Sequence, residues 1–117
     1  GLIVSTPAGS TGWLSSIFNM SYGIANMFEK NLKPKRPKLK DNELLFAVRE
    51  PFQSVRTQIG ITSGIIKTQN SLTIESLMPT SGVIFSDGVE SDFLRFNSGS
   101  IATIGIAKET AKIVMKE

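Results

Sequence analysis

The chain of 117 residues contains no cysteine and no histidine. Without cysteine it has neither disulfides nor thiolate metal sites. Without histidine it has no Ser-His or Cys-His nucleophilic pair and no His-ligated metal site, so carboxylates, lysines, hydroxyls and backbone amides are its only chemical groups. Among the aromatic residues, seven are phenylalanine, one is tryptophan and one is tyrosine. These absences exclude most hydrolase and metalloenzyme classes, and we expect no metal site.

Long apolar runs are absent as well. There is no stretch of about 18 apolar residues and no signal-peptide pattern, so neither a membrane span nor a cleaved leader is expected. What is present is ordinary for one soluble domain: 40% apolar residues, 20% charged residues and a net charge of +3. Because Gly1 is followed at once by Leu2, Ile3 and Val4, we expect the chain to be a segment of a longer protein.

A strand, a glycine-containing loop and a helix are predicted over residues 1–28. Residues 1–5 form a short apolar run typical of a buried strand, and it stops at Pro7. Residues 6–12 are small or turn-forming, and their two glycines allow a close approach of the backbone to a ligand or another segment. From residue 13 to residue 28, apolar side chains recur at helical spacings, which predicts an amphipathic helix with Ser10 or Thr11 as its cap.

This strand-loop-helix junction is the most informative feature for function. It brings backbone amides, hydroxyls and the positive end of a helix dipole to one place, which suits a phosphate or a ribose. It does not match the P-loop pattern, since no lysine occurs before residue 30. Spacing alone favours a plain strand-to-helix turn. Trp13, directly after the loop, is either an aromatic platform for a planar base or a core residue, and the pattern favours the core.

Residues 30–42 are predicted to be a basic connector. Its first part, residues 30–40, holds six of the 13 basic residues, no acidic residue and two prolines. The prolines exclude a recognition helix, and no aromatic residue is interleaved with the cations. A solvated linker is therefore favoured over a nucleic-acid contact.

Beyond the connector, short runs rich in β-branched and aromatic residues alternate with turn signals about every ten residues, which is typical of an antiparallel sandwich or barrel. Asp87 and Gly88 predict a hairpin turn, and residues 93–106 predict another hairpin in which Asn97 or Gly99 takes a positive φ. The predicted fold is mainly β with one or two helices. The predicted strands cover residues 44–49, 57–62, 64–68, 72–75, 82–85, 93–96, 101–106 and 111–115.

One acidic cluster could in principle bind a divalent cation. It consists of Asp87, Glu90 and Asp92. Their spacing does not meet the pattern of an EF-hand loop, so no metal binding is expected there.

Several segments resemble one known family. Residues 1–13, GLIVSTPAGSTGW, resemble the GLIVSTPTGSTAY segment that opens the C-terminal domain of NAD kinases, with Ala8, Gly12 and Trp13 in place of threonine, alanine and tyrosine. Residues 44–51 (LLFAVREP), 86–88 (SDG) and 96–102 (FNSGSIA) resemble the LFSIREP, VDGG and FNDGAIA segments of the mitochondrial-type branch, in the same order. The resemblance spans nearly the whole chain and implies a β-sandwich-like domain after the strand-loop-helix.

NAD kinases transfer the terminal phosphate of ATP, or in some members polyphosphate, to the 2′-hydroxyl of the adenosine ribose of NAD, and Mg²⁺ accompanies the donor. The resemblance implies that residues 1–117 are the single NAD-binding C-terminal domain of such an enzyme. The family's catalytic Asp lies in a GGDGT motif of an N-terminal α/β domain, so no catalytic residue is expected here and the chain alone is expected to be inactive. A homo-oligomer without nucleic-acid or membrane partners is expected, located in the cytoplasm or, in a eukaryote, the mitochondrion.

The resemblance also assigns site residues by position. Thr11 and Gly12 match family residues that contact the adenosine, Trp13 matches the tyrosine that packs on it, and Ser16 falls at a nearby contact position. The change from tyrosine to tryptophan keeps a flat apolar face but loses a hydroxyl. Residues 15–20, SSIFNM, lack the Gly-Gly of other members, which fits the mitochondrial-type branch. The loop adds Gly9 and Ser10, and two positions where a partner subunit of the family contacts the nicotinamide side add Ala47 and Arg49. The expected dinucleotide-binding residues are therefore Gly9, Ser10, Thr11, Gly12, Trp13, Ser16, Ala47 and Arg49.

Two other functions stay open at this point. One is a kinase of a lipid or another alcohol, because diacylglycerol and sphingosine kinases resemble NAD kinases in fold. The other is a non-enzymatic binding module that uses residues 30–40 on nucleic acid or an acidic partner. Binding of NAD or a lipid separates the two kinases, and salt-dependent binding of nucleic acid would support the module.

Overall fold

The structure is a computed structural model that describes residues 1–112 and residue 114. The span predicted as one domain divides into two compact units, the first made of Gly1–Asn70 and the segment from Ile106, the second of Ser71–Gly105. The described residues form small antiparallel sheets and one α-helix, which confirms the mainly β prediction at that level. None of the described helices has the length and apolar character needed to cross a membrane.

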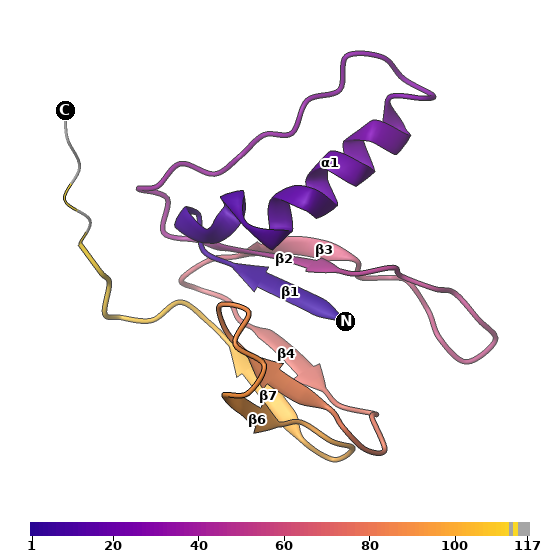
Figure 1. Cartoon of the computed structure of the whole chain (residues 1–117), viewed down its shortest axis with the longest axis vertical. Coiled ribbons are helices and arrows are strands. Elements are labelled where there is room, and N and C mark those ends of the chain that lie inside the picture. The colour runs from indigo at the N-terminus through magenta and orange to yellow at the C-terminus, as the bar shows by residue number, and fades with distance from the viewer. Residues whose placement is uncertain (113, 115–117) are drawn as a thin grey trace. The chain divides into compact units, whose positions relative to one another are not determined.

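The first unit contains an antiparallel sheet with the strand order β1-β2-β3 (Figure 1). The strands are β1 (Leu2–Ser5), β2 (Leu44–Val48) and β3 (Ser63–Ile66). The central strand β2 is the most apolar run of the chain, LLFAV, and its three middle residues are buried. Its pairing with β1 sets Ile3 opposite Ala47, and this register brings the end of β2 beside the start of the chain.

Helix α1 (Trp13–Ala25) packs against this sheet through Leu14, which is 1% exposed. Leu14 forms the core cluster with Leu45 and Ala47 of β2, and Ile3, Ile17 and Phe18 pack around them. Because side chains alternate along a strand, Phe46 points to the opposite face of the sheet. There its ring lies over Gly64, where a Cβ would be 2.6 Å from Phe46 Cε1. Glycine at that position therefore makes room for the ring.

Both ends of α1 differ from their predicted form. The N-cap is Gly12 and no side chain caps the helix, so the predicted cap by Ser10 or Thr11 is wrong. The Ser10 hydroxyl donates instead to the carbonyl of Pro7, at 2.7 Å, within the short 3-10 helix η1 (Ala8–Thr11). At the other end, α1 stops at Ala25 rather than residue 28. There the side-chain amide of Asn26 donates to the Leu32 carbonyl and accepts from the Leu32 backbone amide, which turns the chain away from the helix.

The stretch between α1 and β2 has neither helix nor strand from residue 32 to residue 43. Figure 1 shows it leaving the end of α1 and returning to the start of β2. All six cations of residues 30–40 are exposed. The backbone amide of Lys38 donates to the carboxylate of Asp41, at 2.7 Å, and this turn leads the chain into β2.

The second unit is a nested pair of antiparallel ribbons. The outer ribbon pairs β4 (Leu72–Glu75) with β7 (Ile101–Ile104), and the inner one pairs β5 (Val83–Phe85) with β6 (Phe93–Arg95). Between them the chain bulges over residues 77–81 on one side and 97–99 on the other. The hydroxyl of Ser76, a buried residue, donates to the carbonyl of Phe96, at 2.6 Å, and joins the two sides.

The hairpin predicted over residues 93–106 is wrong, since β6 and β7 pair with different strands. The turn before β6, in which Asp87 (φ 53°) and Gly88 (φ 72°) both take the left-handed conformation, joins β5 to β6. The bond from the Gly82 amide to Asn97 Oδ1 then holds the end of β6 beside the start of β5. Gly99 does take a positive φ, as predicted, and the Ser100 amide donates to the Asn97 carbonyl across that turn.

Two other predicted strands have different outcomes. The strand predicted over residues 57–62 is absent. The Ser54 backbone amide donates to both the carbonyl and the hydroxyl of Thr57 and holds Thr57 in a local turn. The strand predicted over residues 111–115 includes residues 113 and 115, which lie outside the described part of the chain. The other predicted strands agree with the structure to within two residues at each end.

Candidate functional site

The candidate site lies where β1 leads through η1 into α1, within the first unit. The loop is held by its own small side chains. The amide of Gly9 donates to the Thr6 hydroxyl at 3.1 Å, and a Cβ on Gly9 would approach Ser5 Oγ to 3.0 Å. Ser10 is 3% exposed and its hydroxyl donates to Pro7, so its contribution is to fix the loop. A short polar loop of this kind holds the start of α1 against β1.

The first turn of α1 carries the hydroxyls of the half-buried Ser15 and the exposed Ser16, and no acidic residue. The hydroxyls of Ser15 and Ser16 donate to the carbonyls of Gly12 and Trp13, both at 2.7 Å. Each oxygen keeps lone pairs with which it can accept a bond from a ligand. Thr11, just before the helix, is exposed. No side chain caps the helix, so no capping group offsets the positive end of its dipole, and the Ser15 amide donates to the Gly12 carbonyl at 3.0 Å.

Trp13 is the first residue of α1 and is 50% exposed. The expectation from pattern that it belongs to the core is wrong, since the neighbouring Leu14 occupies that place. The guanidinium carbon of Arg49 lies 4.6 Å from the centroid of the Trp13 ring, a cation–π geometry. Arg49 follows β2 directly, and its amide donates to the Gly1 carbonyl at 2.7 Å, which extends the β1–β2 pairing.

The structure thus brings Trp13, Gly12, Ser16 and Arg49 to one end of α1. Ala47 is separate from them: it is 4% exposed and lies in the core cluster, so its side chain faces Leu14 and Leu45. The resemblance named Arg49 and Trp13 for different parts of the ligand, and their contact could not be predicted from spacing. The signal that could have found it is the register of β1 with β2, which sets the end of LLFAV beside the start of the chain.

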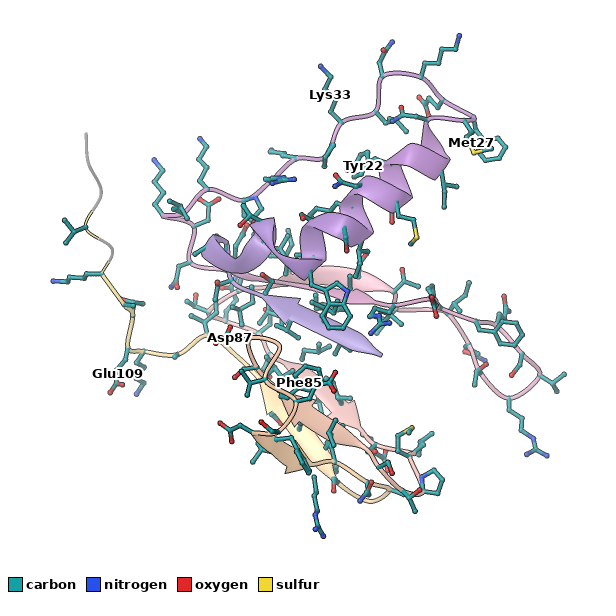
Figure 2. The ribbon with its side chains drawn as sticks, in the orientation of Figure 1. Tyr22, Met27, Lys33, Phe85, Asp87 and Glu109 are labelled. Atoms are coloured by element: carbon teal, nitrogen blue, oxygen red, sulfur yellow. The ribbon has the colours of Figure 1, made fainter. Side chains whose placement is uncertain are left out.

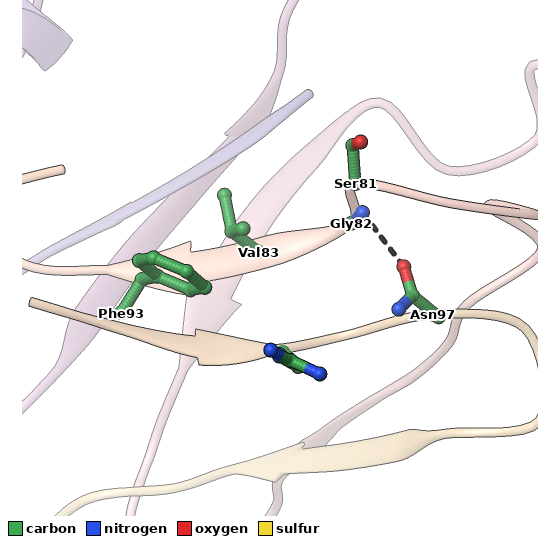
Figure 3. Close-up of a pocket in the computed structure, with 6 residues that line it drawn as sticks. Ser81, Gly82, Val83, Phe93 and Asn97 are labelled. Atoms are coloured by element: carbon green, nitrogen blue, oxygen red, sulfur yellow. Dashed lines mark hydrogen bonds between the residues drawn. The ribbon is translucent and has the colours of Figure 1, made fainter. Parts of the chain in front are cut away.

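A hollow that the sequence did not indicate lies on the β5–β6 ribbon of the second unit (Figure 3). Its volume is about 360 Å³, and it is bordered by Phe93 and Arg95 together with the bulge. The Asn97 carbonyl oxygen Oδ1 accepts from the Gly82 amide at 2.8 Å and so fixes the orientation of the side-chain amide. Position 82 accommodates only glycine, because a Cβ there would overlap the Phe96 carbonyl.

Within the described part of the chain, the acidic residues do not assemble into a cation site. Among residues 1–112 and 114, no three aspartates or glutamates lie together so that they could hold a metal ion. Asp87 takes part in the turn between β5 and β6, where the Val89 amide donates to the Ser86 carbonyl at 3.1 Å. The chemistry available at the candidate site is therefore stacking, hydrogen bonding and one guanidinium charge.

Comparison with known proteins adds no further constraint. No protein-family model, curated protein or solved structure matches this chain. The relation to NAD kinases therefore stays a prediction, which rests on the four similar segments and on the geometry of the loop and α1.

Proposed function

We propose that this chain is the NAD-binding C-terminal domain of an NAD kinase and that it holds the adenosine end of NAD at residues 9–16. The observation that carries the proposal is the half-exposed ring of Trp13 at the start of a helix that has no side-chain cap. A flat ring beside the positive end of a helix dipole suits a ligand in which a planar base is joined to a ribose and phosphates. The GLIVSTPAGSTGW segment, which contains this junction, supports the same assignment.

In the proposed reaction, the 2′-oxygen of the adenosine ribose attacks the terminal phosphorus of ATP or polyphosphate. The bond from that phosphorus to the leaving phosphate oxygen breaks, and the 2′-hydroxyl proton passes to a base in the N-terminal domain of the enzyme. The part of this chain is positional: Trp13 stacks on the base, while the hydroxyls of Thr11 and Ser16 bind the sugar. Among the described residues, no three acidic side chains lie together to hold Mg²⁺, so no residue of this chain is assigned to the metal.

Three further parts of the proposal follow from the resemblance. The small antiparallel sheets belong to a β-sandwich-like domain, and the full enzyme is a homo-oligomer. Its location is the cytoplasm or, in a eukaryote, the mitochondrion. A kinase of a lipid or another alcohol is the alternative on the same scaffold. The STPAGSTGW run argues against this alternative, because the run resembles the corresponding segment of NAD kinases.

Fluorescence of Trp13 tests the proposal, since it is the one tryptophan of the chain and reports directly on the site. The chain is titrated with NAD, with adenosine and with diacylglycerol or sphingosine in micelles, and calorimetry is run in parallel. NAD is expected to produce a saturable change in emission and the lipids none. A flat response to NAD in both measurements, or a saturable response to a lipid alone, would contradict the proposal.

A second candidate function is favoured by one observation. The six cations of residues 30–40 are all exposed, and Lys33 points away from α1 (Figure 2). A run of accessible cations without acidic residues attracts polyanions such as nucleic acid, and such binding weakens steeply with salt. A gel-shift series at rising salt would detect it. Binding that survives in the variant with Lys33, Lys35 and Arg36 replaced by glutamine would exclude these residues as its cause.

A further inference from the structure

The side chain of Arg49 covers one face of the Trp13 ring. It is brought there by the backbone, because the Arg49 amide bonds the Gly1 carbonyl and so continues the antiparallel pairing one residue past β2. Arg49 is itself exposed, and its guanidinium carbon is 4.6 Å from the ring centroid. A planar base that stacks on the exposed part of this ring therefore lies near a positive charge.

The guanidinium keeps its hydrogen-bonding capacity in this position. The five N–H donors of the group lie in its plane and point outward from its edge. Within the described part of the chain, neither an ion pair nor a side-chain hydrogen bond occupies these donors. A planar fork of donors matches a phosphate better than any uncharged group does.

A second positive element lies at the same ring. Trp13 is the first residue of α1, so the positive dipole end of the helix is adjacent to it. No acidic residue occurs in the first turn to offset this potential. A ligand that stacks on Trp13 therefore places any group attached to its sugar in a region of positive potential.

We propose that Arg49 binds the phosphates of the ligand whose adenine stacks on Trp13, and that it thereby selects phosphorylated adenine nucleotides over adenosine. This inference rests on the proposed function and specifies the ligand of the same site. The resemblance implies that Arg49 contacts the nicotinamide side of a ligand bound to the partner subunit. In this proposal Arg49 instead contacts the phosphates of the ligand that is bound to its own chain.

The alternative role for Arg49 is to hold the Trp13 ring in place through the cation–π contact. The two roles predict different results for two ligands that share the adenine. If Arg49 only orients the ring, its removal weakens adenosine and NAD by the same factor. If it binds phosphate, its removal weakens NAD and ADP while adenosine binding is almost unchanged.

The test is calorimetry with NAD, ADP and adenosine on the wild-type chain and on Arg49→Gln, Arg49→Lys and Arg56→Gln. Arg56 is the matched control, because it is an exposed arginine in the loop between β2 and β3. We expect Arg49→Gln to weaken NAD and ADP by about tenfold or more and adenosine less than about twofold, with partial recovery in Arg49→Lys and no effect of Arg56→Gln.

Two results would overturn the inference while leaving the proposed function intact. One is an equal loss for all three ligands in Arg49→Gln, and the other is wild-type affinity for NAD in that variant. If the wild-type chain binds neither NAD nor adenosine, the proposed function fails and the inference fails with it. Circular dichroism of each variant confirms that the fold is retained.

Discussion

Replacing Trp13 by alanine is expected to weaken NAD binding while the chain stays folded. Stacking of a base on an aromatic side chain contributes about 1–3 kcal/mol, so its loss raises the Kd for NAD by roughly 5- to 150-fold. The fold loses less than it would from a buried tryptophan. A half-exposed aromatic ring buries roughly 100 Å², which at about 25 cal/mol per Å² gives ~2.5 kcal/mol, against ~3–5 kcal/mol for a fully buried one.

The assay is calorimetric titration of the chain with NAD, accompanied by chemical unfolding of each variant. Met20→Ala is the matched control, since Met20 is 54% exposed on the same helix and lies outside the candidate site. It should leave the Kd unchanged. Trp13→Tyr, which restores the residue of the similar family segment, should stay within about threefold of wild type because a stacking face remains. A folded Trp13→Ala variant with the wild-type Kd would refute the stacking role.

The remaining predictions concern stability, and each is measured by urea unfolding. Leu14→Ala should lower the unfolding free energy by about 2–5 kcal/mol, because it empties the centre of the core cluster; a smaller loss would place the core elsewhere. Gly82→Ala should cost about 1–3 kcal/mol through overlap with the Phe96 carbonyl, whereas Gly60→Ala, which meets no atom within 4 Å, should cost less than about 1 kcal/mol. Gly23→Ala, also in open space but within α1, should stabilise by about 0.5–1 kcal/mol, and a loss there would contradict the helix.

The parts of the fold that were predictable are those encoded by local pattern. The apolar run LLFAV and the strand at residues 72–75 were found because turn residues bound them on both sides. The pairing of β6 was not predictable in this way. Two turn signals flank it, at Gly88 and at Gly99, and both glycines take a positive φ. Local turn chemistry therefore cannot choose the partner, which depends on the bonds that Ser76 and Asn97 make across the bulge.

The candidate site shows the same division between local and long-range information. The loop and helix start were predicted from small residues followed by helical spacing. The exposure of Trp13 was not, because Trp13 and Leu14 are neighbours on similar apolar positions, and only packing against Leu45 decides which one is buried. The contact of Arg49 with the ring likewise depends on strand register, a property of two distant segments rather than of either one.

Amide chemical-shift mapping of the chain during an NAD titration tests the central claim most directly, because it locates the ligand without altering any residue. The proposed function predicts saturable shifts for residues 9–16 and for Arg49, with the amides of residues 30–40 and of the β5–β6 ribbon unchanged. Shifts confined to residues 30–40, or to the hollow beside Phe93, would contradict it, as would a spectrum that NAD leaves unchanged at saturating concentration.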